Sequence, residues 1–229
     1  MAKNTTEVVT TSPALPALFE GNDLLDSGTI KLPGIYLNHA LSQATKDGVA
    51  TPGEMIVKRT PDDAAPLSLG KKGDSFDAYI IHVDVSYARF EDGGMEWLTK
   101  AEFEKARLDR EYGVWRVFRY TCYVPDFGEV LPVSLMLTRM AGKAASEQIN
   151  TLLAQRQLEG NNKPVGVRLS TRERSSKNGK HTYDSWVAVP IPADDVPEGA
   201  LDTANGMRSF IQSASYQEPS TDVEGAPAL

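Results

Sequence analysis

The chain has 229 residues and a formal net charge of −7; 41% of its residues are hydrophobic and 24% are charged, as in an ordinary globular protein. Its one cysteine, Cys122, cannot form an internal disulfide, which excludes a secreted cystine-rich scaffold. No apolar run approaches the ~20 residues that cross a bilayer, and the first residues lack the basic start and apolar stretch of a signal peptide. We therefore expect a soluble, cytoplasmic protein with no membrane partner.

The net charge hides an uneven distribution along the chain. Residues 1–99 carry 8 basic and 14 acidic side chains, residues 100–190 carry 15 and 10, and residues 191–229 carry 1 and 7. The middle is therefore net positive, at +5, between two ends of −6 each. A basic centre is typical of a surface that binds a polyanion, although basic residues interleaved with acids also make an ordinary solvated surface.

Composition divides the chain into four regions. Residues 1–28 are rich in Thr, Ser, Pro and Ala and predict a flexible N-terminal arm. Residues 29–191 hold the periodic hydrophobic segments and predict the folded domain. Residues 192–214 predict a linker rich in Pro and Asp followed by a short helix, and residues 215–229 predict a disordered acidic tail.

The domain begins with weakly patterned segments. Residues 29–41 are interrupted by Pro33 and Gly34, which favours an edge strand or an extended segment over a helix. A short strand is expected at Met55 to Lys58, and the turn signals of residues 60–75 predict a loop.

The clearest strand covers Phe76 to Phe90, where apolar and polar residues alternate. It is expected to be antiparallel and half-buried, and its apolar face comprises Tyr79, Ile81, Val83, Val85 and Tyr87. A charged, superficial helix is expected over residues 98–112, because Thr99 and Glu102 have the spacing of a capping box.

Two hairpins separated by a helix follow. Strands are predicted at Val114–Val124 and Val130–Leu137, joined by a Pro-Asp-Phe-Gly turn. Apolar residues at helical spacing predict a helix over residues 141–158. The last hairpin is expected to pair residues 164–170 with residues 182–190 across a basic loop.

These elements predict a mainly β protein with inserted helices. Connection lengths favour antiparallel pairing, and a helix between two hairpins fits a small curved barrel. The oligonucleotide-binding (OB) fold is the commonest barrel of this kind. An open α+β sheet is the alternative.

The sequence contains no recognisable catalytic motif. It has no CxxC pair, no phosphate-binding GxxxxGK[ST] loop, no GxGxxG after a strand and no GxSxG elbow. His82 and Asp84 are two residues apart on one strand face, and a partly exposed pair with no catalytic role is the simpler interpretation. We therefore expect a non-catalytic protein with no metal and no cofactor.

Aromatic and basic residues are interleaved in the predicted strands. Single-stranded nucleic acid is held by this combination, because rings stack on bases while Arg and Lys neutralise phosphates. Strands also favour aromatic residues in their cores, which is the competing interpretation. The densest basic segment, Arg168 to Lys180, has a net charge of +4. The candidates for phosphate contact are Arg116, Arg119, Arg168, Arg172, Arg174, Lys177 and Lys180, and the stacking candidates are Tyr120, Tyr183 and Trp186.

Three segments resemble a family of bacteriophage-encoded proteins. They are CYVPDFGEVLPVSLMLTRMAGKAASEQINTLLAQ, KPVGVRLSTRERSSKNGKHTYDSW and the upstream IKLPGIYLNHALSQATKDGVATPGEMI, in which Asn38-His39 and Glu54 depart from the family pattern. The resemblance covers about residues 30–190. Some proteins of this kind look like single-stranded DNA-binding proteins of phage replication and recombination modules, so the resemblance implies this role in the host cell cytoplasm.

The basic centre and the resemblance lead to one hypothesis, a non-catalytic protein that binds single-stranded DNA without sequence specificity. Phage replication or recombination proteins are further expected partners, and homo-oligomerisation stays open. The acidic tail ends Ala-Pro-Ala-Leu and lacks the terminal Phe that follows the acidic tail of bacterial single-strand binding proteins. The alternative is a phage structural or protein-interaction module whose basic hairpin contacts an acidic partner.

Overall fold

The structure is a computed structural model that describes residues 32–39, 43–60, 63, 65–91, 94–161, 163–176 and 182–213. The predictions of a flexible arm at residues 1–28 and a disordered tail at residues 215–229 lie outside the described residues.

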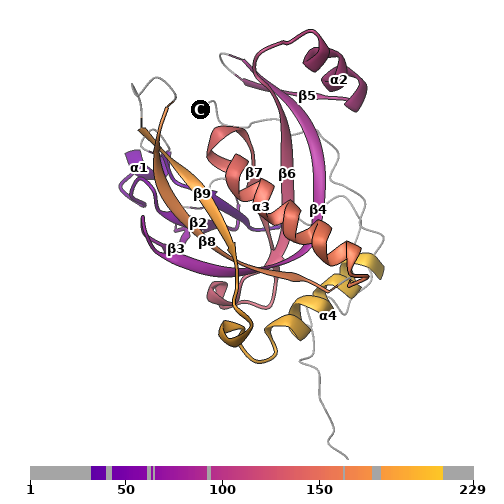
Figure 1. Cartoon of the computed structure of the whole chain (residues 1–229). Coiled ribbons are helices and arrows are strands. Elements are labelled where there is room, and N and C mark those ends of the chain that lie inside the picture. Colours follow the sequence, from indigo (N-terminus) through magenta and orange to yellow (C-terminus); the bar gives the residue numbers. More distant parts are fainter. Residues whose placement is uncertain are drawn as a thin grey trace, which may run out of the picture.

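Nine strands of the described chain form one sheet, which curls into a half-barrel around a long helix (Figure 1). The strand order is β3-β2-β1-β7-β6-β4-β8-β9, and β5 pairs with β4. The strands are β1 (Gly34–Leu37), β2 (Met55–Lys58), β3 (Leu67–Gly70), β4 (Ser75–Glu91), β5 (Gly94–Leu98), β6 (Val114–Tyr123), β7 (Pro132–Leu137), β8 (Val165–Ser175) and β9 (Thr182–Pro190). The helices are α1 (Gln43–Lys46), α2 (Lys100–Leu108), α3 (Arg139–Leu158) and α4 (Ala200–Ser213), with 3-10 turns at Pro125–Phe127 and Ala193–Asp195.

The mainly β architecture confirms the prediction, and the curled sheet is consistent with an OB-like barrel. The prediction of purely antiparallel pairing is wrong at one place, because β1 runs parallel to β7. The predicted edge strand is therefore an internal one, between β2 and β7. Pro33 is compatible with this position because it precedes the strand, and its carbonyl accepts a hydrogen bond from the Ser134 amide at 2.8 Å.

The long strand β4 matches the predicted strand almost to its ends, but it is not a single flat ribbon. Its register with β6 passes from Ile80 to His82, so Ile81 forms a bulge that bends the strand. The bulge splits the expected apolar face. Tyr79 and Ile81 pack under α4, whereas Val83 packs against the main core.

Helix α3 fills the open side of the half-barrel, as Figure 1 shows. Ala145 and Ile149 are fully buried in the main core. Gly142 permits the close approach to β7, because a Cβ there would lie 2.9 Å from the backbone of Leu137. Cys122 is part of the same core, and burial raises the pKa of its thiol to about 12.

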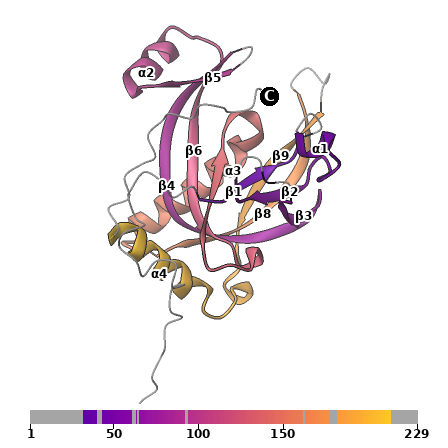
Figure 2. The same ribbon diagram turned by 180° about the vertical axis from the view of Figure 1, so that it is seen from behind.

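Helix α4 covers part of the opposite face of the sheet. Ala204 and Met207 are buried against Tyr79 and Ile191. Figures 1 and 2 place α4 at the end of the molecule opposite α2. Residues 200–213 are thus docked on the sheet.

The C-terminal half of β4 and the first half of β6 extend from the body, with β5 and α2 at their far end (Figures 1 and 2). We call residues 87–91 and 94–116 the arm. Helix α2 has the predicted capping box, since the Thr99 amide donates to the Glu102 carboxylate at 2.7 Å and the Glu102 amide donates to Thr99 Oγ1 at 3.3 Å. The helix docks through the buried Phe103, whose ring lies 4.6 Å from that of Tyr87.

Replacing Ile149 by Ala tests whether α3 is part of the core. The side chain is fully buried, so its truncation is expected to lower the free energy of unfolding by about 2–5 kcal/mol in urea denaturation. Gln157→Ala, on the exposed side of the same helix, should change it by less than about 0.5 kcal/mol. Equal effects of the two substitutions would contradict this packing.

Candidate nucleic-acid interface

The far end of the β8–β9 hairpin carries three of the predicted site residues on one face. The sequence predicts a loop at Arg172 and Arg174, but β8 continues to Ser175 and both residues belong to the strand. Arg174 lies directly opposite Tyr183 on β9. Because alternate residues of a strand share a face, Arg172, Arg174 and Tyr183 form one surface, which we call the outer face of the hairpin. Lys177 and Lys180 lie outside the described residues.

The acidic residues of this hairpin lie on its other face. Glu173 and Asp184 are cross-strand neighbours, and like charges in that position repel each other. Lys72, from the turn before β4, offsets the repulsion because its ammonium lies 2.6 Å from Glu173 and 2.9 Å from Asp184. The hydrogen bonds to Glu173 and then Asp184 raise the pKa of Lys72.

His39 lies near the same acidic residues. Burial lowers its pKa, and the negative charge of Asp184 opposes that shift only in part. The imidazole is therefore neutral near pH 7, and Lys72 supplies the positive charge for this cluster.

The outer face is cationic as a result. Within the described ranges, no carboxylate forms an ion pair with Arg172 or Arg174, and both side chains are exposed. Tyr183 is partly exposed beside them. Two unpaired guanidinium groups next to an accessible ring can bind a phosphate and a planar base together.

Trp186 is predicted to stack on bases, and its burial corrects that prediction. Its side chain is 4% exposed and packs edge-on against Phe76, with ring centroids 6.4 Å apart. It shares the inner side of the hairpin with its cross-strand neighbour Thr171, whose hydroxyl donates to the Gly53 carbonyl at 3.4 Å. Trp186 therefore anchors the hairpin to the body.

Tyr120 is also a core residue, contrary to the prediction. Its ring is 0% exposed, and its hydroxyl donates to Asn150 Oδ1 at 3.0 Å. Burial raises the pKa of this hydroxyl, and the hydrogen bond to Asn150 offsets only part of the rise. A ring enclosed between sheet and helix has no free side for a base.

Arg168 is engaged in ion pairs and is not available for phosphate in this conformation. Its guanidinium donates to both carboxylate oxygens of Asp77, at 2.8 and 3.2 Å, and to Asp195 at 3.1 Å. These hydrogen bonds, first to Asp77 and then to Asp195, raise the pKa of Arg168. The prediction of a phosphate contact at this residue is therefore not supported.

Arg116 and Arg119 lie apart from the hairpin surface. The Arg116 guanidinium lies 5.8 Å from the ring centroid of Phe103 on the arm. Arg119 is on β6, directly opposite Asp84 of β4. His82 Nε2 lies 2.8 Å from Asp84 Oδ1, so the predicted proximity of these two residues is confirmed, on an exposed sheet face.

Sequence reasoning missed Lys72 altogether. It stands in a segment predicted as a loop, and its partner Glu173 is 101 residues away along the chain. No local pattern indicates such a contact.

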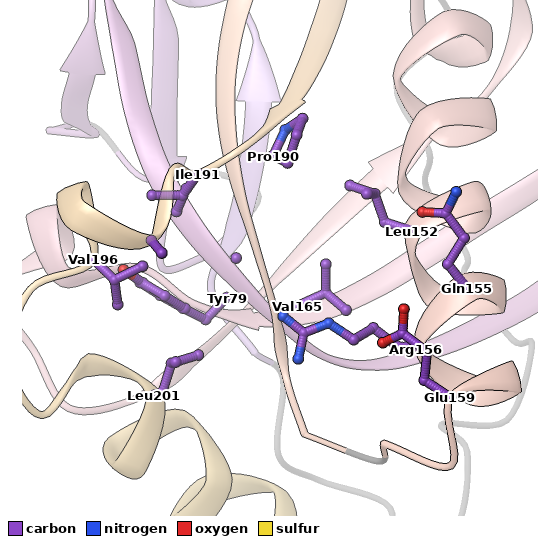
Figure 3. Close-up of a pocket in the computed structure, with 12 residues that line it drawn as sticks. Tyr79, Leu152, Gln155, Arg156, Glu159, Val165, Pro190, Ile191, Val196 and Leu201 are labelled. Carbon is purple, nitrogen blue, oxygen red and sulfur yellow. The ribbon is translucent and has the colours of Figure 1, made fainter.

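A separate pocket of about 430 Å³ lies between α3, the end of β9 and α4 (Figure 3). Its walls are mainly apolar, with Leu152, Val165 and Leu201 pointing inward (Figure 3). Arg156 and Glu159, which carry opposite charges, lie on the α3 side. The pocket therefore has no net charge with which to attract a polyanion.

The described residues contain no group of three or more His, Cys, Asp or Glu side chains that could hold a metal ion. In the part of the chain that the structure covers, no helix is both long and apolar enough to cross a bilayer. Comparisons with protein-family models, curated proteins and solved structures give no match.

Replacing Lys72 by Met tests whether this side chain holds the hairpin together. With its ammonium gone, Glu173 and Asp184 repel each other, and amide hydrogen exchange in residues 171–176 and 182–186 is expected to accelerate. Adding Glu173→Gln and Asp184→Asn to that variant removes the repulsion and should restore protection. Unchanged exchange in the single variant would show that the hairpin does not depend on Lys72.

Proposed function

We propose that the chain is a non-catalytic protein that binds single-stranded DNA without sequence specificity, through the outer face of the β8–β9 hairpin. The observation that carries the proposal is the grouping of Arg172, Arg174 and Tyr183, with the acidic residues of the hairpin turned to its other face.

The chemistry of this face matches a flexible polyanion with planar bases. Each guanidinium can neutralise a phosphate, and the phenol ring of Tyr183 offers a surface on which any base can stack. Such contacts do not read base edges, so binding is expected to be independent of the base sequence of the DNA. In a duplex the bases are already stacked on each other, and a single strand therefore gains more from Tyr183.

The acidic total charge of the chain is compatible with this proposal. Attraction at short range depends on the local field, and screening in physiological salt limits the reach of distant carboxylates to about 8 Å. The setting in a phage replication or recombination module comes from the sequence resemblance alone. Proteins of such a module are the further partners that it suggests.

Removing the two arginines should weaken binding in a salt-dependent way. For Arg172→Ala/Arg174→Ala, the slope of log K against log[salt] for fluorescent oligo-dT should become shallower by about 0.7 for each phosphate that is no longer neutralised. The matched control is Lys100→Ala/Lys105→Ala, which removes the same charge from exposed positions of α2.

The control variant should keep the slope of the native chain. If the salt slope falls equally in both variants, only the net charge of the chain matters. If the native chain does not bind oligo-dT at low salt, the proposal is refuted. Duplex DNA and RNA of the same length, titrated in parallel, define the nucleic acid that is preferred. If the chain binds neither oligo-dT, duplex DNA nor RNA but binds an acidic protein, the interaction-module alternative is favoured.

Tyr183 provides a test that is independent of charge. Tyr183→Leu should reduce the binding free energy by about 1–3 kcal/mol, because an aliphatic side chain cannot stack on a base. Tyr183→Phe keeps the ring and should bind nearly as the native chain does. If Tyr183→Leu and Tyr183→Phe bind oligo-dT equally well, the ring of Tyr183 does not stack on a base.

A further inference from the structure

We propose that the arm provides a second binding surface for the same single strand, formed by Trp97 and Trp115 with Arg139. This inference rests on the proposed function and extends it, because it assigns a two-part site in which the strand runs from the hairpin to the arm.

The register of the arm places Trp97, Trp115, Phe90 and Met95 on one face. Ala88 of β4 lies opposite Trp97 of β5 on one side and Trp115 of β6 on the other, and Phe90 lies opposite Met95. Cross-strand partners point to the same side of a sheet, so these five residues share one surface, which we call the aromatic face.

The aromatic face keeps its rings accessible. Ala88 is fully buried between the two tryptophans, and its single methyl group leaves space for an indole on either side. Trp97, Trp115 and Phe90 are each partly exposed. Partly exposed indoles on the two strands that flank β4 are suited to stacking on bases of one strand.

Positive charge accompanies these rings. The Arg139 guanidinium lies 3.9 Å from the ring centroid of Phe90. Arg119 is four residues from Trp115 on β6 and therefore lies on the same side of that strand. Its cross-strand neighbour Asp84 shares that side, and the predicted site residue Arg119 lies at the base of the arm, away from the hairpin.

Three acidic residues of the arm gather around Arg89 on its other face. Arg89 binds Glu96 at 3.0 Å, Glu111 at 2.7 Å and Glu91 at 3.8 Å. Arg89 is one residue from Ala88, so it points to the opposite side of β4. In the hairpin and in the arm alike, a cation thus gathers carboxylates on the face opposite the accessible rings.

The two surfaces belong to the same end of the molecule. Figures 1 and 2 both show the arm and the far end of the β8–β9 hairpin at the end opposite α4, with the beginning of α3 between them. Arg139 is the first residue of α3, and its guanidinium lies against Phe90 of the arm. A strand that binds both surfaces would pass this residue.

The charges favour nucleic acid over a second copy of this chain as the occupant. A two-fold interface through the aromatic face would bring the same patch of each copy together, so the Arg139 side chains of the two copies would repel each other. A polyanion with planar groups is attracted by the same cations and stacks on the same rings.

Tryptophan fluorescence tests the inference on the native chain. The chain has three tryptophans, and Trp186 is buried in the hairpin. Stacking of bases on Trp97 and Trp115 should quench emission when oligo-dT of about 30 nucleotides is added, and Trp97→Phe/Trp115→Phe should abolish the quenching while binding persists.

Variants of the aromatic face should show a dependence on oligonucleotide length. Trp97→Leu/Trp115→Leu should weaken binding of the long oligo-dT at least about fivefold, the effect of removing one stacked ring, and leave an oligo-dT of about 8 nucleotides bound as before. Arg139→Asn should lower the salt slope for the long oligonucleotide only, and Asn tolerates the positive φ of 54° at this position. Tyr112→Leu, which removes the exposed ring of Tyr112 outside the paired strands, is the matched control and should have no effect.

The outcomes separate the two claims. Unquenched emission together with unchanged affinity of Trp97→Leu/Trp115→Leu for the long oligonucleotide would overturn the proposed role of the arm. If Arg172→Ala/Arg174→Ala still weakens binding in that case, the hairpin site stands alone. If the native chain binds no oligonucleotide, both proposals fail.

Discussion

The whole architecture depends on the hydrogen bonding of one strand, β4, along both of its edges. One edge pairs with β6 from Tyr79 to Arg89; the other pairs with β8 over residues 75–80 and with β5 over residues 87–91. This strand curves along its length, and the bulge at Ile81 provides a bend. Because β4 curls under the molecule, its first residues lie at the base of the hairpin and its last residues form the arm (Figure 1). The proposed nucleic-acid site spans these two ends of a single strand.

Strand alternation also sorts the charges. In the hairpin, Glu173 points away from its neighbours Arg172 and Arg174 and is bound by Lys72. In the arm, three carboxylates surround Arg89 on the face opposite the tryptophans. In each case one cation gathers acidic side chains that would otherwise weaken the attraction of a nearby surface for a polyanion. A net acidic protein can thus display cationic surfaces even where acidic and basic residues alternate along a strand.

The periodic parts of the fold were predictable from sequence. Alternation over Phe76 to Phe90, the apolar spacing in α3 and the Thr99–Glu102 capping box are local signals, and each element formed where it was expected. The short strands β3 and β5 were missed because four or five residues between turns carry too little pattern. The parallel pairing of β1 with β7 was missed because it joins segments about a hundred residues apart, for which no local rule exists.

The candidate site was predictable only in part, for a related reason. The sequence predicts Arg172, Arg174 and Tyr183 as candidates but puts the two arginines in a loop, and it does not tell which face of a strand meets the core. Tyr120 and Trp186 are on the buried side of their strands. On the exposed side, either ring could have stacked on a base. Arg168 meets Asp77 91 residues away, and only the folded chain brings them together.

Photochemical crosslinking of oligo-dT to the whole chain, with adducts located by mass spectrometry, tests the central claim most directly. The account predicts adducts at Tyr183 on the outer face of the hairpin, where a ring adjoins two exposed arginines. They should disappear as salt is raised, because phosphate contacts hold the strand in place. Absence of adducts at low salt, or adducts confined to the pocket beside α4, would contradict it.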